Sequence, residues 1–310
     1  MKTKLLVLLI LLLTALPARA DESLTKIRFG ILPVLDTLPL QVAAAEGLFH
    51  ENGLDVELVT FASALERDTA LQAGQLDGFF GDLIATYMLI DKGVPMRIAS
   101  TSYSTRPGQP MFAIVASPER KGVGLDGLKG AEIAISKSTI IEYLLDRILE
   151  RKTLPRDYFR RVEIKKIPIR LQMLLSNEID LALLPEPLVS LTRFKGGSMV
   201  VTAETLGIPL TVLNLHRRYF EGKAKHYLSF MSAYVEALVL LRKHPEKYRE
   251  LMAVSCRIPP PLAPDFPIYD YPMPSLPSAQ QLDSVQDWMI EHDLLDERIP
   301  RDWAVSPVAP

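Results

Sequence analysis

The hydrophobic pattern from residue 27 to residue 82 predicts a strand–helix–strand–helix–strand unit. Ile27, Phe29 and Ile31 alternate with polar or small residues as in a strand, and Pro33 ends the run. A striped helix, a second strand, a second helix and a short third strand follow, at residues 40–48, 56–61, 63–73 and 76–80. Strands separated by helices pair in parallel, and such sheets bind ligands in the loops at their carboxyl ends. These loops therefore predict a cleft for a small polar molecule.

A second copy of this pattern begins at residue 132. Its strands and helices are expected at residues 132–136, 141–149, 162–167, 170–176 and 179–184. Each third strand opens with an aliphatic residue and an aspartate, Asp77 in the first copy and Asp180 in the second. Each then runs into a carboxylate, Asp82 or Glu186. Because order, spacing and end residue agree together, we expect two similar βαβαβ lobes whose loop ends face each other.

The rest of the chain is expected to connect these lobes and to return to the first one. Residues 111–116 form a continuous apolar run, typical of a strand buried on both faces, and residues 210–215 predict the returning strand. Helices are expected at residues 227–241 and 282–292, separated by a belt with eight prolines between Pro259 and Pro277. We favour a rigid surface belt there over a proline-recognition ligand. The predicted organisation is a signal peptide (1–20), lobe I (21–112), lobe II (113–206) and a return to lobe I (207–310).

Composition agrees with a globular protein of about two domains. The chain has 310 residues, 48% of them hydrophobic and 23% charged, with a formal net charge of −2. There is no basic block, so no nucleic-acid partner is expected.

The first twenty residues predict a cleaved signal for export. Lys2 and Lys4 precede an apolar run, and Ala18-Arg19-Ala20 forms a cleavage site. The run is shorter than the roughly 20 residues of a membrane span, which disfavours the alternative of an uncleaved anchor. The single cysteine, Cys256, allows no internal disulfide, and no cysteine follows the apolar run as in a lipoprotein. We expect cleavage after Ala20 and a free, monomeric periplasmic protein.

Helix N-termini and carboxylates are the predicted walls of the cleft. Three N-termini, after Thr37, at Ser63 and at Ser138–Thr139, suit an anion or the acceptor atoms of a heterocycle. The carboxylates favour an amine or another donor-rich group, and Tyr103 is placed to stack on a planar ligand. The predicted ligand-binding residues are Asp36, Thr37, Leu38, Ser63, Ala64, Asp82, Ser102, Tyr103, Ser136, Ser138, Thr139 and Glu186.

Several of these positions also have an ordinary structural interpretation. Asp82 precedes a helix and is equally suited to cap it. Ser63 and Glu66 have the spacing of a capping box. Glu186 lies between two prolines, which favours a role in the cleft over one in the core. The glycine-rich residues 121–130 lack the Lys-Ser/Thr ending of a phosphate loop, so we interpret them as an ordinary connection.

These residues resemble a known family. GILPVLDTLPL and GLDVEL in the first lobe, and LKGAEIAIS and DLALLPEPL in the second, are similar to ABC-transporter solute-binding proteins of the nitrate, sulfonate, taurine and thiamine-pyrimidine group. The resemblance covers residues 27–215. It implies a type II periplasmic-binding fold of class α/β, with two lobes of mostly parallel sheet joined by crossover strands near residues 112–117 and 205–213. It also implies a ligand enclosed between the lobes and a membrane permease as partner.

The expected function is therefore the binding component of an ABC importer for a sulfonate, an amine or a pyrimidine-like solute. A sensory protein that feeds a membrane receptor is the main alternative, and neighbouring genes for a permease and an ATPase would decide between them. A biosynthetic enzyme of similar fold is less favoured, because no H-E-x-x-H, G-x-S-x-G or CxxC motif occurs. We expect no catalytic residue, no metal and no cofactor.

Overall fold

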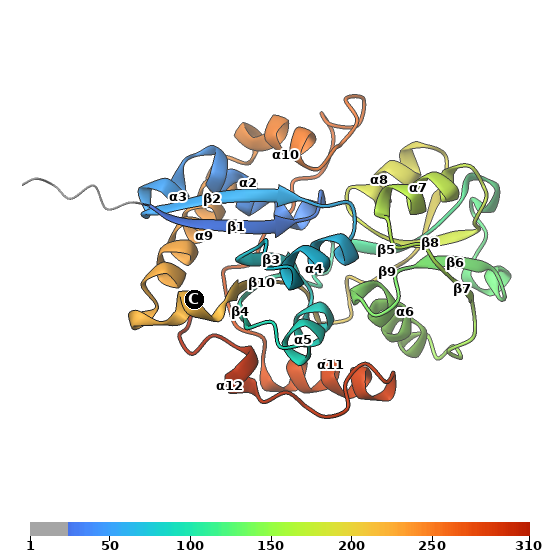
Figure 1. The fold of residues 1–310 in the computed structure, drawn as a ribbon. Helices are drawn as coiled ribbons and strands as arrows, with labels where there is room; N and C mark the ends of the chain where they lie inside the picture. Colours follow the sequence, from blue (N-terminus) through green and yellow to red (C-terminus); the bar gives the residue numbers. More distant parts are fainter. Residues whose placement is uncertain (1–23) are drawn as a thin grey trace, which may run out of the picture.

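The computed structural model describes residues 24–310, so the predicted signal peptide lies outside the described residues. Within that range the chain forms two five-stranded sheets (Figure 1). We call the first sheet with its helices lobe I, and the second with its helices lobe II. The lobe I sheet has the strand order β2 (Leu54–Thr60), β1 (Thr25–Ile31), β3 (Gly78–Gly81), β10 (Pro209–His216), β4 (Met96–Ser104). The lobe II sheet has the order β7 (Arg160–Glu163), β6 (Glu132–Ile135), β8 (Leu181–Pro185), β5 (Phe112–Ala116), β9 (Ser198–Thr202).

Each sheet contains one strand that runs against the other four. In lobe I this is β10, which pairs antiparallel with β3 and β4, while β1 pairs parallel with β2 and β3. In lobe II it is β5, antiparallel to β8 and β9, while β6 pairs parallel with β7 and β8. Each reversed strand has just crossed from the other lobe. The prediction of a two-lobed α/β fold with mostly parallel sheets is confirmed.

The two crossings between the lobes are short and lie side by side. They are residues 105–111 and 203–208, between β4 and β5 and between β9 and β10. The Thr105 amide donates to the Ile208 carbonyl at 2.9 Å, and the Ile208 amide donates to the Thr105 hydroxyl at 2.8 Å. The crossings expected at residues 112–117 and 205–213 are thus displaced, because the apolar runs of β5 and β10 are drawn into the middle of the sheets. We retain 112/113 and 206/207 as proposed lobe boundaries.

Helices cover both faces of each sheet (Figure 1). In lobe I, α2 (Leu38–Ala45), α3 (Leu48–Glu51) and α9 (Lys225–Lys243) lie on one face, and α4 (Ala64–Gln72) and α5 (Leu83–Asp91) on the other. In lobe II, α6 (Ile140–Arg151) lies opposite α7 (Ile167–Leu175) and α8 (Leu188–Phe194). The outer helices are α10 (Arg249–Ser255), α11 (Ala279–Glu291) and α12 (Arg301–Ala304). Burial on both faces explains why β5, β8 and β10 read as continuous apolar runs.

The local predictions fail where a single residue changes the backbone. The first helix is split into α2 and α3 at Gly47, whose φ of 73° leaves the helical region. The strand expected at residues 162–167 ends at Glu163, since α7 starts at Ile167 with Pro168 in its first turn. Helix α8 and strand β9 were not predicted. The proline belt contains neither helix nor strand, as expected.

Helix α11 connects the two lobes a second time. It packs on α5 of lobe I, while its Trp288 indole donates to the Asp146 carboxylate of α6 at 2.8 Å. His292 places Nε2 3.0 Å from the same carboxylate oxygen. In Figure 1 the red helix α11 accordingly lies below both α5 and α6. Any hinge movement at the crossings would have to move α6 along this helix.

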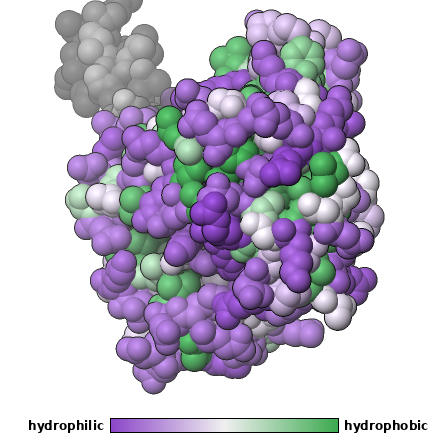
Figure 2. Space-filling view, turned by 90° about the vertical axis from the view of Figure 1, so that its right-hand side faces the viewer, coloured by the Kyte–Doolittle hydropathy of each residue, from purple (hydrophilic) through white to green (hydrophobic). Residues whose placement is uncertain are grey.

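The outer surface is mixed in character. The lobe II side seen in Figure 2 carries hydrophilic side chains over most of its area, with hydrophobic ones in smaller patches between them. None of the helices formed by residues 24–310 combines the length and the apolar character that a membrane span requires.

Candidate ligand-binding site

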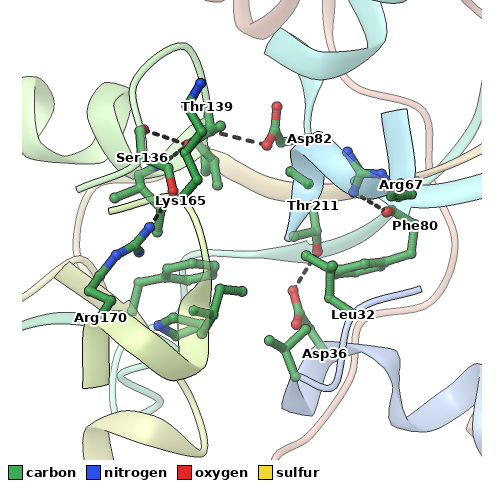
Figure 3. Close-up of a pocket in the computed structure, with 18 residues that line it drawn as sticks. Leu32, Asp36, Arg67, Phe80, Asp82, Ser136, Thr139, Lys165, Arg170 and Thr211 are labelled. Atoms are coloured by element: carbon green, nitrogen blue, oxygen red, sulfur yellow. Dashed lines mark hydrogen bonds between the residues drawn. The ribbon is translucent and has the colours of Figure 1, made fainter. Parts of the chain in front are cut away.

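The two sheets enclose a cavity of about 60 Å³ where their loops meet (Figure 3). Lobe I lines it from the segment after β1, from α4, β3 and β10, and lobe II from β5, the segment after β6, α6, α7 and β8. Apolar side chains make up most of the wall, among them Leu32, Phe80, Phe112, Ile140 and Ile167. Polar and charged side chains from both lobes complete the wall, and such a mixed lining suits a small polar molecule.

Asp36 lies in a short 3-10 helix (Leu35–Thr37) after β1 and is one of the polar groups of lobe I. Its side chain is 1% exposed, and its Oδ2 accepts a hydrogen bond from the Thr211 hydroxyl at 2.8 Å. Its Oδ1 is buried without a hydrogen-bond partner among the described residues. Burial raises the pKa of Asp36 to about 7, while the bond from Thr211 acts in the opposite direction. A buried carboxylate oxygen without a donor is costly, and this cost is why burial favours the neutral form of the Asp36 side chain.

Asp82 both caps a helix and faces the cavity. Its Oδ1 accepts the Ala85 amide of α5 at 2.8 Å, which is the capping interpretation. Its Oδ2 accepts the Ile140 amide at the start of α6 at 3.2 Å, so the same carboxylate joins lobe I to lobe II. Burial raises the pKa of Asp82, and the Ala85 amide and Arg67 lower it in part. Both carboxylate oxygens are therefore occupied within the protein.

Two buried arginines line the cavity and were missed in the sequence. Arg67 of α4 donates to the Phe80 carbonyl at 2.6 Å, and Arg170 of α7 donates to the Leu183 carbonyl at 3.2 Å. Each carbonyl follows its arginine by 13 residues. Both arginines precede the aspartate of the aliphatic-Asp pair of their lobe by ten residues, a repeat that aligning the two copies would have revealed.

The two arginines differ in their charge partners. Arg67 forms an ion pair with Asp68 at 2.7 Å. Arg170 contacts neutral acceptors, the Ile164 and Leu183 carbonyls and the Ser136 hydroxyl. None of the ion pairs among residues 24–310 includes it, and burial lowers its pKa to about 10, so it stays charged at neutral pH.

Five of the twelve predicted site residues line the cavity: Asp36, Ala64, Asp82, Ser136 and Thr139. Thr139 also caps α6, and its hydroxyl accepts a hydrogen bond from the Ile141 amide at 3.2 Å. A helix therefore begins at this position, as predicted. Ser136 accepts its bond from Arg170.

The other seven lie outside the cavity wall. The Thr37 hydroxyl donates to the Val34 carbonyl, and Leu38 is buried inside lobe I. The Ser63 hydroxyl accepts the Glu66 amide at 3.2 Å as the cap of α4, but Glu66 reaches back to the Ala62 amide instead of that of Ser63. The Ser138 amide donates to Glu142.

Three of those seven are held by neighbours within the fold. Tyr103, expected to stack on a ligand, packs edge-to-face on Tyr271 with ring centroids 6.0 Å apart, because β4 extends to Ser104 and carries it into the core. Ser102 donates to the Asp36 carbonyl. The Glu186 carboxylate accepts from the Ser190 amide and hydroxyl at 3.0 and 2.8 Å and from the Tyr269 hydroxyl at 3.3 Å.

Direct contacts between the lobes close the rim of the cavity. The Leu35 amide donates to the Glu186 carbonyl at 3.0 Å, and Lys166 forms an ion pair with Glu66 at 3.2 Å. Together with the bond between Asp82 and Ile140, these contacts hold the facing loops together. The structure therefore has the two lobes in contact around the site.

A family model describes residues 20–255 of this chain as NMT1-like. The chain belongs to the NMT1-like family. No curated protein matches it in sequence.

Solved structures of similar fold are numerous. The alkanesulfonate-binding protein SsuA from Xanthomonas axonopodis pv. citri, bound to MOPS, has a TM-score of 0.76 at 18% identity, covering 91% of this chain and 98% of that one. The periplasmic aliphatic sulphonate binding protein SsuA from Escherichia coli has a TM-score of 0.74 at 16% identity, with 91% and 97% covered. The periplasmic nitrate-binding protein NrtA from Synechocystis PCC 6803 has a TM-score of 0.60 at 18% identity, with 75% and 65% covered. At these identities the likeness concerns the fold of this NMT1-like protein.

Proposed function

We propose that this NMT1-like protein is the periplasmic solute-binding component of an ABC importer. It captures a small polar organic ligand, such as a sulfonate, an amine or a pyrimidine-like compound, and delivers it to a membrane permease. The observation that carries the proposal is the cavity at the facing loop ends of two sheets, with polar groups from both lobes. The binding proteins of similar fold, for alkanesulfonates and for nitrate, support it. The proposal assigns no reaction to the protein.

The proposal includes the site and the location of the protein. The wall residues Asp36, Ala64, Asp82, Ser136 and Thr139 are the first candidates for ligand contact, joined by Arg170. The chain reaches the periplasm through a signal peptide cleaved after Ala20 and acts there as a monomer.

Ligand capture follows from the two crossings. A ligand binds to one lobe, and bending at residues 105–111 and 203–208 brings the other lobe over it. Changing the open-to-closed ratio from about 1:99 to 99:1 requires about 5.5 kcal/mol of preference for the closed form. The few contacts between the lobes, above all that of Asp82 with Ile140, contribute part of this preference.

The experiment uses the mature chain from Asp21 onward. A thermal-shift screen of sulfonates, amines, pyrimidines and flavin-like compounds identifies a stabilising ligand, and small-angle scattering then measures the radius of gyration with and without it. We expect stabilisation together with compaction. A ligand that stabilises the protein without compacting it would overturn the closing mechanism.

Asp82→Asn tests the contact between the lobes. Asparagine keeps one acceptor for the Ala85 amide but presents an NH₂ group to the Ile140 amide. We expect ligand affinity to fall about tenfold or more, since a hydrogen bond to a charged group contributes about 1.5–3 kcal/mol. The exposed Asp126→Asn is the matched control. A large loss of melting temperature at unchanged affinity would assign Asp82 to capping alone.

A further inference from the structure

After the internal contacts are accounted for, one charged group of lobe I is left facing the cavity with a free binding position. Asp82 has both oxygens occupied, and Arg67 is compensated by Asp68. Asp36 keeps Oδ1 without a donor, and none of the ion pairs among residues 24–310 includes its carboxylate. Its position in the wall is shown in Figure 3, on the opposite side of the cavity from Arg170.

Lobe II presents a positive charge that has hydrogen bonds but no counter-charge among the described residues. The Arg170 side chain is 0% exposed and donates only to two carbonyls and the Ser136 hydroxyl. Leu171 follows it in sequence, where Asp68 follows Arg67. Lys165 also lines the cavity, but it is half-exposed and pairs with Glu163 at 3.4 Å.

A buried charge is normally paired with an opposite charge, and the four hydrogen bonds from Arg170 to neutral acceptors offset its cost only in part. An anionic ligand would balance Arg170 but would leave Asp36 without a donor and add a like charge near it. A cationic ligand would leave Arg170 uncompensated. A ligand that carries both a cationic and an anionic group can pair with Asp36 and with Arg170. It can contact both residues only when the two lobes are together.

Building on the function proposed above, we propose that the ligand is a small zwitterion. Its protonated nitrogen donates to Asp36 Oδ1 of lobe I, and its anionic group lies against Arg170 and Ser136 of lobe II. Asp36 is thus the residue that selects zwitterions over simple anions. The small cavity restricts the ligand to a short chain between its two charged groups.

Binding is then linked to the ionisation of Asp36. The titratable groups that face it are Tyr103 from β4, Tyr234 from α9, Tyr271 from the proline belt and Cys256 after α10. Burial raises the pKa of each of these groups, so all are neutral near pH 7, and Asp36 alone among them changes charge there. Because the ligand nitrogen needs the ionised carboxylate, affinity rises from about pH 6 to about pH 8 and a proton is released on binding below about pH 7.

The test is calorimetry with five probes of matched length. The zwitterions are 3-aminopropane-1-sulfonate and β-alanine, the anions are propane-1-sulfonate and propionate, and the cation is propylamine. We expect the mature protein to bind at least one zwitterion ten times or more tighter than the matching anion and than propylamine. The preference over the matching anion should grow with pH, because the charges of the probes themselves stay constant over this range. The preference over propylamine should stay constant, because both ligands need the ionised carboxylate.

Variants test the contributions of Asp36 and Arg170 to binding separately. Asp36→Asn should abolish both the preference for zwitterions and the pH dependence, while anions bind at least as well as before. Arg170→Gln should weaken zwitterions and anions alike. Asp126→Asn should behave as the unmodified protein, and cooperative unfolding of each variant confirms that it is folded.

Three results would overturn the inference: anions that bind as tightly as zwitterions, a preference that survives in Asp36→Asn, or no binding of either zwitterion. The pH profile of the unmodified protein tests it independently of any variant. Compaction with a ligand that carries one kind of charge would refute the zwitterion and leave the solute-binding function standing. Absence of stabilisation by every compound of the screen would count against that function instead.

Discussion

Lobe I and lobe II place an arginine at equivalent points of the same βαβαβ pattern, but only lobe I gives its arginine a carboxylate. Arg67 donates to the Phe80 carbonyl and pairs with Asp68, whereas Arg170 donates to the Leu183 carbonyl and is followed by Leu171. The hydrogen-bond scaffold of the two arginines is shared and the charge compensation is not. On the proposal made above, a bound ligand supplies the counter-charge that lobe II lacks.

Two buried carboxylates, one in each lobe, also differ in how fully the protein satisfies them. Glu186 of lobe II is fully supplied with donors by Ser190 and Tyr269 and lies outside the cavity. Asp36 of lobe I lines the cavity and has one oxygen without a donor. Burial raises the pKa of both side chains, so burial alone does not distinguish the two carboxylates. They differ in the number of hydrogen-bond donors that contact their oxygens.

The largest expected effect is the change in stability when the poorly hydrogen-bonded Asp36 is made neutral. The folded-state pKa of Asp36 is raised from 3.8 to about 7, so the folded protein binds more protons than the unfolded chain between these values. Its destabilising effect is absent below about pH 4 and complete above about pH 7, and at 1.36 kcal/mol per pKa unit it reaches about 4 kcal/mol at most. Asp36→Asn should therefore be more stable than the unmodified protein at pH 8 and equal to it near pH 4. Urea unfolding of the ligand-free protein at both pH values measures this.

Glu186→Gln is the matched comparison for Asp36→Asn. It should lose about 1–2 kcal/mol, since an NH₂ group replaces an acceptor among donors. A gain of stability in Glu186→Gln, or none in Asp36→Asn, would remove the distinction between the two carboxylates.

The second prediction concerns the two arginines. Arg67→Met leaves Asp68, which is 21% exposed, without its partner, and breaking a buried pair costs about 3–5 kcal/mol. We expect the lower end, about 3 kcal/mol, because Asp68 is partly hydrated. Arg170→Met should cost less, about 1–2 kcal/mol, because the loss of its donors is offset by removal of an uncompensated charge. Urea unfolding compares both with the exposed Arg151→Met, and a larger loss for Arg170→Met would show that its charge is compensated within the protein.

The smallest effect tests a difference in the central strands. Gly78 of β3 has no side chain, whereas Leu181 holds the corresponding place in β8. A Cβ at Gly78 would lie 2.7 Å from the Asn214 carbonyl oxygen of β10, and backbone cannot move aside as a side chain does. We expect Gly78→Ala to cost about 1–3 kcal/mol through overpacking. Gly124→Ala, with open space around it, should leave the melting temperature unchanged, and an equal effect of both substitutions would contradict the overpacking argument.

The sequence by itself determined the repeat, most of the secondary structure and the local caps. The aliphatic-Asp pairs are a clear case. Asp77 accepts the Arg28 amide at 2.8 Å, and Asp180 accepts the Glu132 amide at 3.1 Å, each tying the third strand of its lobe to the first. The caps at Ser63, Asp82 and Thr139 are local as well, because each joins residues within a few positions of one another. The caps follow from short-range geometry and can be predicted from spacing. The bonds of Asp77 and Asp180 span 49 and 48 residues, and the sequence showed only the repeated aliphatic-Asp pair that precedes each third strand.

Only the tertiary structure decided which of these groups line the cavity. Asp82 meets Ile140, 58 residues away, and Asp36 meets Thr211, 175 residues away, on a strand that has returned from the other lobe. Tyr103 and Glu186 were plausible in sequence, but the fold supplies them with Tyr271, Ser190 and Tyr269 as partners. Whether a buried charge is satisfied depends on every group around it in space, and the chain order of residues does not contain that information. For this reason the cleft was predictable, whereas its two uncompensated charges were not.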